Sequence, residues 1–244
     1  MPTPPAAARW CSNDALAPFA HGGLIMRPAT CLTVMLDRQT TALIRPAIDA
    51  LARVLVRAGV GADALTFTGL ALGWLAAAAI ALRSPLAGAV LILVSRLFDG
   101  LDGAVARQTR PTDRGGFLDI SLDFLFYPAI PLAFAIADPA RNALAAAVLL
   151  AAFVGTGTSF LAFAVIAAKR GLTSAAYPNK SFYFLGGLTE ATETLAFFIA
   201  MCLWPAQFAL LAGAFAAMCA VTIATRVAWG WQAFAPTDAE PRQP

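Results

Sequence analysis

The sequence contains unusually little charge. Asp, Glu, Lys and Arg make up 13% of the 244 residues, whereas about 25% is usual in soluble domains. Hydrophobic residues make up 59%, and the mean hydropathy is +0.72. A chain of this composition cannot cover a globule with polar side chains. This excludes a soluble enzyme and an intrinsically disordered protein, and it predicts a polytopic membrane protein of the all-α class.

Several chemical groups are also scarce. The only histidine, His21, lies near the N-terminus, and none of the four cysteines stands in a CxxC pair. Thiolate–histidine catalysis and a histidine-based zinc site are therefore not expected, and the apolar composition excludes a disulfide scaffold. The net charge is only +3, which gives no reason to expect a nucleic-acid partner.

The N-terminal part of the chain changes character at Met35. Residues 1–34 are rich in Pro and Ala and contain no signal-peptide segment, so we expect a disordered tail or a mis-assigned extension, with Met35 rather than Met1 as a possible start. From Met35 to Gly59, apolar residues recur at helical spacing among Arg and Asp. This pattern predicts an amphipathic helix on the cytosolic membrane surface, with an ordinary cytosolic helix as the alternative. Residues 35–232 would form the membrane domain and 233–244 a short polar tail.

Six apolar segments follow, each near the ~20 residues that cross a bilayer. They span residues 64–82, 84–101, 117–137, 142–168, 182–204 and 206–230. If the N-terminus is cytosolic, only Arg83 and Arg141 lie on the far side of the membrane. The positive-inside rule then predicts six transmembrane helices with both termini in the cytosol.

Four aspartates mark the second and third segments. Asp99 and Asp102 are three residues apart, and Asp119 and Asp123 are four apart, so each pair shares one helical face. About 14 residues separate each pair from the far-side loop, which is roughly 21 Å of helix, so both pairs lie at one depth. Arg96, one turn before Asp99, would be an active-site cation or a partner to a carboxylate.

Carboxylates gathered at one depth in a membrane repel each other unless cations neutralise them. Carboxylate oxygens suit Mg²⁺ or Mn²⁺, and four carboxylates can hold two such ions. A metal pair near the headgroups suits phosphoryl chemistry on a lipid. A cation-coupled transporter is the alternative, although transporters usually bind ions at the bilayer midplane on broken helices. A non-catalytic assembly factor that retains the site is a third hypothesis.

The aspartates belong to the longer pattern D-x2-D-G-x2-A-R-x7-G-x3-D-x3-D, which runs from Asp99 to Asp123 with all eight fixed positions filled. This pattern resembles the signature of the CDP-alcohol phosphotransferase family. The six segments after an amphipathic helix extend the resemblance over most of residues 35–230. The chain looks most like an uncharacterised branch of the family in the bacterial inner membrane. The resemblance implies a transferase of phospholipid biosynthesis, and homodimers are common in the family.

The resemblance also implies roles for the acidic residues. Asp99 and Asp119 would bridge two divalent cations, and Asp102 would complete one metal site. Asp123 would serve the second metal and act as the base toward the incoming hydroxyl. That hydroxyl would attack the lipid-side phosphate of a CDP-alcohol, most simply CDP-diacylglycerol, with release of CMP.

Five further residues would bind the CDP-alcohol by the same resemblance. Gly103 and Arg107 would contact the pyrophosphate, and Ala106 would leave room for the nucleotide. The family's first span usually opens Pro-Asn-x-x-Thr. Here Thr66 fits that pattern, but Asp63 replaces the Asn. Thr112 is the candidate for a hydroxyl that often assists between the Arg and the following Gly.

The acceptor alcohol is not specified by the motif. Lys169, Arg170 and Lys180 could bind an acceptor phosphate, or could be ordinary positive-inside charge. Glu190 and Glu193 could bind hydroxyls or a cationic group of the acceptor, or could be protonated acids that hydrogen-bond to a neighbouring helix. Glycerol 3-phosphate, inositol phosphate, serine, another phosphatidyl lipid or a different alcohol would each fit.

Overall fold

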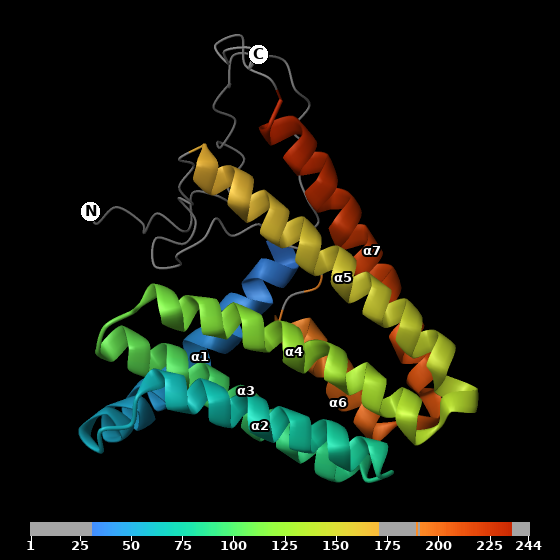
Figure 1. Cartoon of the computed structure of the whole chain (residues 1–244), viewed down its shortest axis with the longest axis horizontal. Helices are drawn as coiled ribbons and strands as arrows, with labels where there is room; N and C mark the ends of the chain where they lie inside the picture. Colours follow the sequence, from blue (N-terminus) through green and yellow to red (C-terminus); the bar gives the residue numbers. More distant parts are fainter. Residues whose placement is uncertain (1–30, 171–188, 190, 236–244) are drawn as a thin grey trace, which may run out of the picture.

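A computed structural model describes residues 31–170, Thr189 and 191–235, with side chains from Ile44 onward. All regular structure in these ranges is helical (Figure 1). The elements are α1 (Cys31–Arg57), α2 (Ala62–Ala81), α3 (Pro85–Gln108), α4 (Asp113–Ala137), α5 (Pro139–Lys169), α6 (Ala191–Leu203), the 3-10 turn η2 (Pro205–Gln207) and α7 (Phe208–Ala233). The expected all-α class is therefore confirmed for the described part of the chain.

Four helical segments are long and apolar enough to cross a membrane: α2, α4, α5 and the segment Pro205–Ala233, which includes α7. They correspond to the segments expected at 64–82, 117–137, 142–168 and 206–230. The segment expected at 84–101 lies in α3, which continues through the acidic motif to Gln108. Only the last part of the segment expected at 182–204 is described as a helix, and this is α6.

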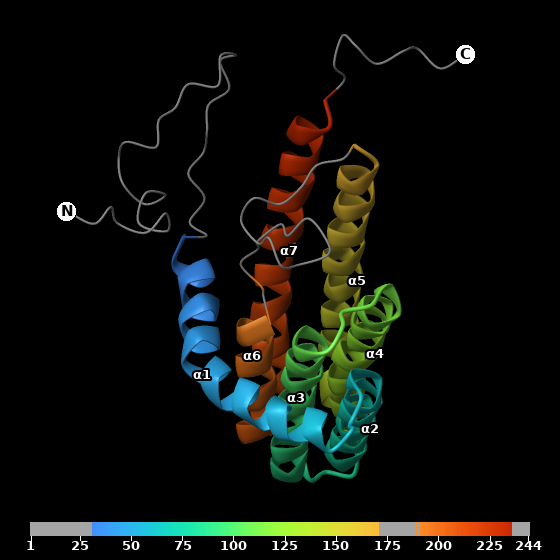
Figure 2. The same ribbon diagram turned by 90° about the vertical axis from the view of Figure 1, so that its left-hand side faces the viewer.

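Helix α1 begins at Cys31, four residues before the expected start at Met35, while residues 1–30 lie outside the described part. Pro46 lies inside α1, where it lacks the backbone N–H of a helical hydrogen bond and favours a kink. Figure 2 shows α1 descending beside the bundle and then turning across α3. Its second half buries Ala52 against Leu101 and Val105 of α3.

Helix α2 is the common support of α3 and α4, since both pack against it. Glycines allow this close approach. At Gly69, an added Cβ would lie 3.4 Å from the Ser95 carbonyl oxygen of α3, and at Gly73 it would lie 2.4 Å from the Phe126 ring of α4. The Ser95 hydroxyl also donates a hydrogen bond to the Gly69 carbonyl at 2.7 Å. These contacts fix how α3 and α4 face each other.

The main core is shared by the helices α2 to α7, and its aromatic rings come from α4, α5, α6 and α7. Phe153 packs edge-on against Phe198 and Phe215, and Phe197 stacks on Phe215 with ring centroids 4.7 Å apart. In contrast, large apolar side chains such as Leu144 and Trp231 are exposed on the outside. An apolar exterior around an aromatic core is the arrangement that lipid, rather than water, would surround.

Candidate active site

Three of the four motif aspartates meet between α3 and α4. Asp99 and Asp102 of α3 and Asp119 of α4 each offer a carboxylate oxygen, and these oxygens lie within 4.8 Å of one another. Asp102 is buried, and its Oδ2 makes no hydrogen bond within the described part of the chain. A buried carboxylate oxygen without a donor is costly unless a cation binds it. The donor set and this oxygen both fit a hard divalent cation such as Mg²⁺ or Mn²⁺.

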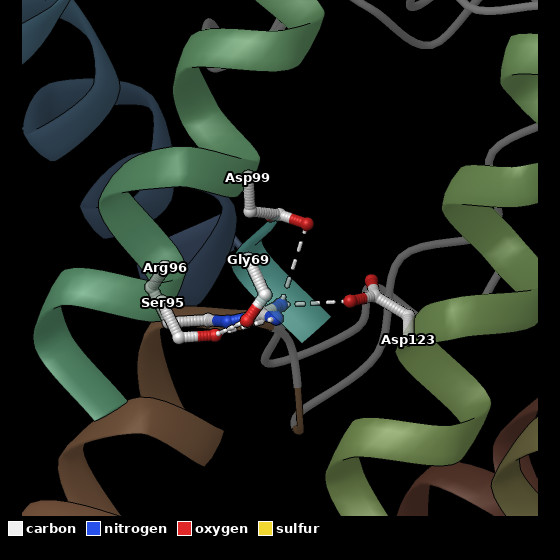
Figure 3. Close-up of polar contacts among 5 residues, drawn as sticks. All are labelled: Gly69, Ser95, Arg96, Asp99 and Asp123. Carbon is white, nitrogen blue, oxygen red and sulfur yellow. Dashed lines mark hydrogen bonds and ion pairs between the residues drawn. The ribbon is translucent and has the colours of Figure 1, made fainter. Parts of the chain in front are cut away.

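The fourth aspartate, Asp123, lies opposite Asp99 and is bound by Arg96 (Figure 3). Arg96 Nη1 donates to Asp123 Oδ1 at 2.7 Å and lies 3.5 Å from Asp99 Oδ1. The guanidinium also lies over the Phe126 ring, 3.9 Å from its centroid. The sequence left Arg96 as either an active-site cation or a partner to a carboxylate, and the structure shows it bound to the Asp123 carboxylate.

A small cavity lies at the aspartates, and α2 forms part of its wall. Thr66 and Gly69 of α2 line it together with Asp99, Asp119 and Asp123. The Thr66 hydroxyl donates to the Ala62 carbonyl one turn earlier at 3.1 Å. The residue expected near the nucleotide therefore lies beside the carboxylates, at the N-terminal end of α2.

Arg107 lies one turn beyond the aspartates on α3 and folds back over Gly103. A Cβ added at Gly103 would lie 3.3 Å from Arg107 Nη1, so a larger residue would crowd the guanidinium. Arg107 is about half exposed, and its Nη2 lies 4.0 Å from Asp49 Oδ1 of α1. Ala106 is partly buried beside it. The guanidinium is half exposed and its ion pair with Asp49 is long, so it could bind an anionic phosphate.

The remaining donor-side residues have structural partners. The Thr112 hydroxyl accepts a hydrogen bond from the Gly115 N–H at 3.1 Å, which makes Thr112 the N-cap of α4. Asp63, which replaces the Asn of the family pattern, forms an ion pair with Arg114. This pair joins the N-terminal ends of α2 and α4. Sequence reasoning did not identify Arg114 as the partner, because the two residues are 51 positions apart.

The residues expected to bind the acceptor are only partly described, because Lys180 and Glu190 lie outside the described residues. Lys169 is exposed at the end of α5, and Glu193 is partly buried in the first turn of α6. Arg170 Nη2 donates to the Phe234 carbonyl at 3.2 Å, and its guanidinium lies over the Phe234 ring. Arg170 therefore holds the end of α7 against the end of α5.

A further partly buried cation, Arg226 of α7, was not among the residues predicted from the sequence. Its Nη1 donates to the Thr156 carbonyl of α5 at 3.1 Å, and its guanidinium lies 5.7 Å from the Phe160 ring centroid. Close by on α7, the buried Thr222 hydroxyl accepts a hydrogen bond from the Thr189 hydroxyl at 3.0 Å. The sequence feature that could have identified Arg226 is a charged residue inside the apolar segment 206–230.

Comparisons with known proteins agree with this arrangement. Residues 60–229 match the family model of CDP-alcohol phosphatidyltransferase. The inner membrane protein YnjF of Escherichia coli is 52% identical over 197 residues, which are 81% of this chain and 96% of that protein. Archaetidylinositol phosphate synthase of Methanothermobacter thermautotrophicus is 45% identical over 84 residues, which are 34% of this chain and 42% of that enzyme.

Solved structures of phosphatidylinositol phosphate synthase from Mycobacterium tuberculosis share the fold. The structure with CDP-DAG bound has a TM-score of 0.64 and 22% identity, covering 81% of this chain and 98% of that one. The structure in complex with manganese and citrate has a TM-score of 0.64 and 21% identity, covering 80% and 93%. At this identity the likeness establishes the fold alone.

Proposed function

The chain belongs to the CDP-alcohol phosphatidyltransferase family, and on this premise we propose that it transfers a phosphatidyl group from CDP-diacylglycerol to an alcohol acceptor and releases CMP. The observation that carries the proposal is the meeting of Asp99, Asp102 and Asp119, with Asp123 opposite, inside a chain of this family. The structural neighbour with CDP-DAG bound supports the choice of donor.

The aspartates are the residues that would hold divalent cations. Asp99, Asp102 and Asp119 would hold one Mg²⁺ or Mn²⁺, and Asp123 would help to hold a second together with Asp99 and Asp119. The manganese complex of the structural neighbour supports the choice of a divalent cation. When bound, such ions stabilise negative charge on the phosphoryl oxygens and on the leaving group.

The chain's own residues would bind and orient the reactants. Arg107, with Gly103 beneath it, would bind the pyrophosphate, while Ala106 and Thr66 would border the nucleotide. Asp123 would accept the proton of the acceptor hydroxyl. The hydroxyl oxygen then forms a bond to the lipid-side phosphorus, and the bond from that phosphorus to the oxygen of CMP breaks. Positioning and charge neutralisation supply most of the rate enhancement in such transfers.

The acceptor would approach from the side of α5, α6 and α7. Lys169, Lys180 and Glu190 remain candidates for its recognition, together with the partly buried Glu193. Arg170 is a weaker candidate than the sequence indicated, because its guanidinium binds the end of α7. Thr112 remains a candidate for donor contact, although its hydroxyl already caps α4.

We further propose that the chain crosses the bacterial cell membrane six times, with α3 and α6 as parts of the second and fifth spans and both termini in the cytosol. The inner-membrane relative supports this location. Helix α1 would lie at the cytosolic surface, because it buries one apolar side on α3 and exposes others, such as Leu51 and Val54. A homodimer would be consistent with the family resemblance.

The test is release of CMP by the purified protein in nanodiscs. CDP-diacylglycerol and Mg²⁺ or Mn²⁺ would be supplied with single acceptors: glycerol 3-phosphate, inositol phosphate, serine, phosphatidylglycerol or no acceptor. We expect CMP release that needs the metal and one acceptor and that is lost in Asp123→Asn. Ion flux into proteoliposomes without CMP release would instead indicate a transporter, which no observation on the described residues favours.

A further inference from the structure

We infer that Arg96 occupies a cation position in this site, so that one divalent cation binds readily at Asp99, Asp102 and Asp119, whereas a second binds at Asp123 only by displacing Arg96. The inference rests on the proposed function, because it concerns the metals of the same reaction. Arg96 lies outside the eight fixed positions of the motif. It is thus a feature that the motif alone does not specify.

The first support is the place of the guanidinium. Arg96 Nη1 lies between carboxylates of two helices, 2.7 Å from Asp123 Oδ1 and 3.5 Å from Asp99 Oδ1 (Figure 3). These are the two aspartates that face each other across the gap between α3 and α4. A divalent cation shared by Asp99 and Asp123 would need the same space and the same oxygens.

The second support is that Arg96 is held in this place rather than extended into solvent. Its side chain is 15% exposed, and the planar guanidinium lies against the faces of Phe126 and Tyr127. Its Nη2 is 3.5 Å from Ser95 Oγ, which is itself bonded to the Gly69 carbonyl of α2. Stacking on an aromatic face stabilises a desolvated guanidinium and reduces its freedom to leave.

The third support is the balance of charge. With Arg96 in place, one divalent cation leaves a single negative charge among the four carboxylates. As long as Arg96 stays beside the carboxylates, a second dication would make the site positive, unless Arg96 moves away or a substrate anion enters with the ion. The pyrophosphate of the donor is such an anion. The second cation should therefore bind with the donor, while Asp123 exchanges Arg96 for the metal.

The experiment measures Mn²⁺ binding to the purified full chain in detergent, by electron paramagnetic resonance of free Mn²⁺ and by calorimetry, first without donor. Wild type should bind one ion tightly. Arg96→Gln should bind two, the second at least about tenfold more tightly than in wild type, because a nearby positive charge is removed. Arg96→Lys, which keeps the charge, should behave as wild type. Arg141→Gln loses the same charge from an exposed site on α5 and should also be unchanged.

A purely structural role for Arg96 predicts something different. Arg96→Gln would then bind Mn²⁺ equally or less tightly while remaining folded, and this result would overturn the inference. If the variant does not fold, Mn²⁺ binding to wild type tests the inference. A second ion that binds only with CDP-diacylglycerol supports it, and two equally tight ions without donor contradict it. If wild type releases CMP but binds two Mn²⁺ ions equally tightly without donor, the inference about Arg96 is wrong and the proposed function still holds. If wild type neither binds Mn²⁺ nor releases CMP, the proposed function is contradicted as well.

Discussion

At the scale of single residues, the site combines carboxylates that differ in their surroundings. Asp102 is buried and has an oxygen without a hydrogen-bond donor in the described structure, whereas Asp123 is already bound to a guanidinium. Two aspartates of one motif therefore differ in how readily they can bind a divalent cation: Asp102 has an oxygen available, whereas Asp123 is already bound to Arg96. The motif spacing shows that they share helix faces, but it does not show this difference.

Asp102 should be the residue on which the first cation depends most. We expect Asp102→Asn to weaken Mn²⁺ binding by at least about tenfold, since a charged ligand oxygen is replaced by a neutral amide. The measurement is a Mn²⁺ titration of the purified variant without donor. Asp113→Asn removes an exposed carboxylate from the first turn of α4 and serves as the matched control. Equal Mn²⁺ affinity in the two variants would contradict the assignment of Asp102.

The sequence predicted the aspartate cluster because spacing along a helix determines which residues share a face. It left two alternatives for Arg96, because the choice depends on how α3 and α4 face each other. That arrangement is set by close contacts of Gly69 and Gly73 with neighbouring helices, which a single sequence does not reveal. The ion pair of Asp63 with Arg114 was missed for the same reason.

At the scale of helices, hydropathy located the elements better than it located their ends. The second apolar segment was expected to end at Leu101, but α3 continues to Gln108. Hydropathy follows the change from apolar to polar side chains, whereas the backbone remains helical through the polar motif. The end expected for the segment 117–137 agrees with the structure, because α4 ends at Ala137. Asp138 then caps the next helix, α5, by accepting a hydrogen bond from the Arg141 N–H.

The start of α4 should depend on Thr112 as its N-cap. Thr112→Ala should lower the free energy of unfolding by about 1 kcal/mol, because the Gly115 N–H loses its acceptor. Thr112→Asn should preserve most of the stability, since Asn is also a good N-cap. Thermal unfolding in detergent measures both. If Thr112→Asn is stable but binds CDP-diacylglycerol poorly, the hydroxyl has a role beyond the cap.

The packing of α2 on α4 should be sensitive to Gly73. A Cβ there would meet the buried Phe126 ring at 2.4 Å, so Gly73→Ala should destabilise the protein by about 1–3 kcal/mol. Because Phe126 also supports Arg96, the variant should alter Mn²⁺ binding as well. Gly213→Ala is the control, since nothing lies within 4 Å of the added Cβ on α7. Equal thermal stability of the two variants would show that the α2–α4 contact is looser than described.

At the scale of the whole molecule, four helical segments meet the length and hydropathy of membrane spans. Helix α3, which carries Asp99 and Asp102, is not among them. Its polar side chains face α2 and α4, while Leu93 and Leu97 are exposed on its outer surface. A helix can cross a membrane with buried charges if they are paired within the protein. If α3 crosses the membrane as proposed, its charged site is the reason that it does not meet the hydropathy of the other four segments.

The proposed crossing of α3 can be tested by labelling. Ser84→Cys and Arg110→Cys, at opposite ends of α3, would be introduced singly into a chain without its native cysteines. A membrane-impermeant thiol reagent should label Ser84→Cys from outside the cell membrane and Arg110→Cys only in inverted vesicles. Labelling of both from one side would contradict a spanning α3 and the six-span topology.

The proposed reaction at the aspartate cluster is the transfer of a phosphatidyl group from a CDP-alcohol to an acceptor. The most direct measurement supplies wild type and Asp123→Asn with CDP-diacylglycerol carrying labelled acyl chains, Mn²⁺ and the acceptor panel, and quantifies CMP and labelled lipid product together. We expect equimolar CMP and one new lipid with wild type and neither with Asp123→Asn. Equal product formation by the two proteins would contradict the proposal.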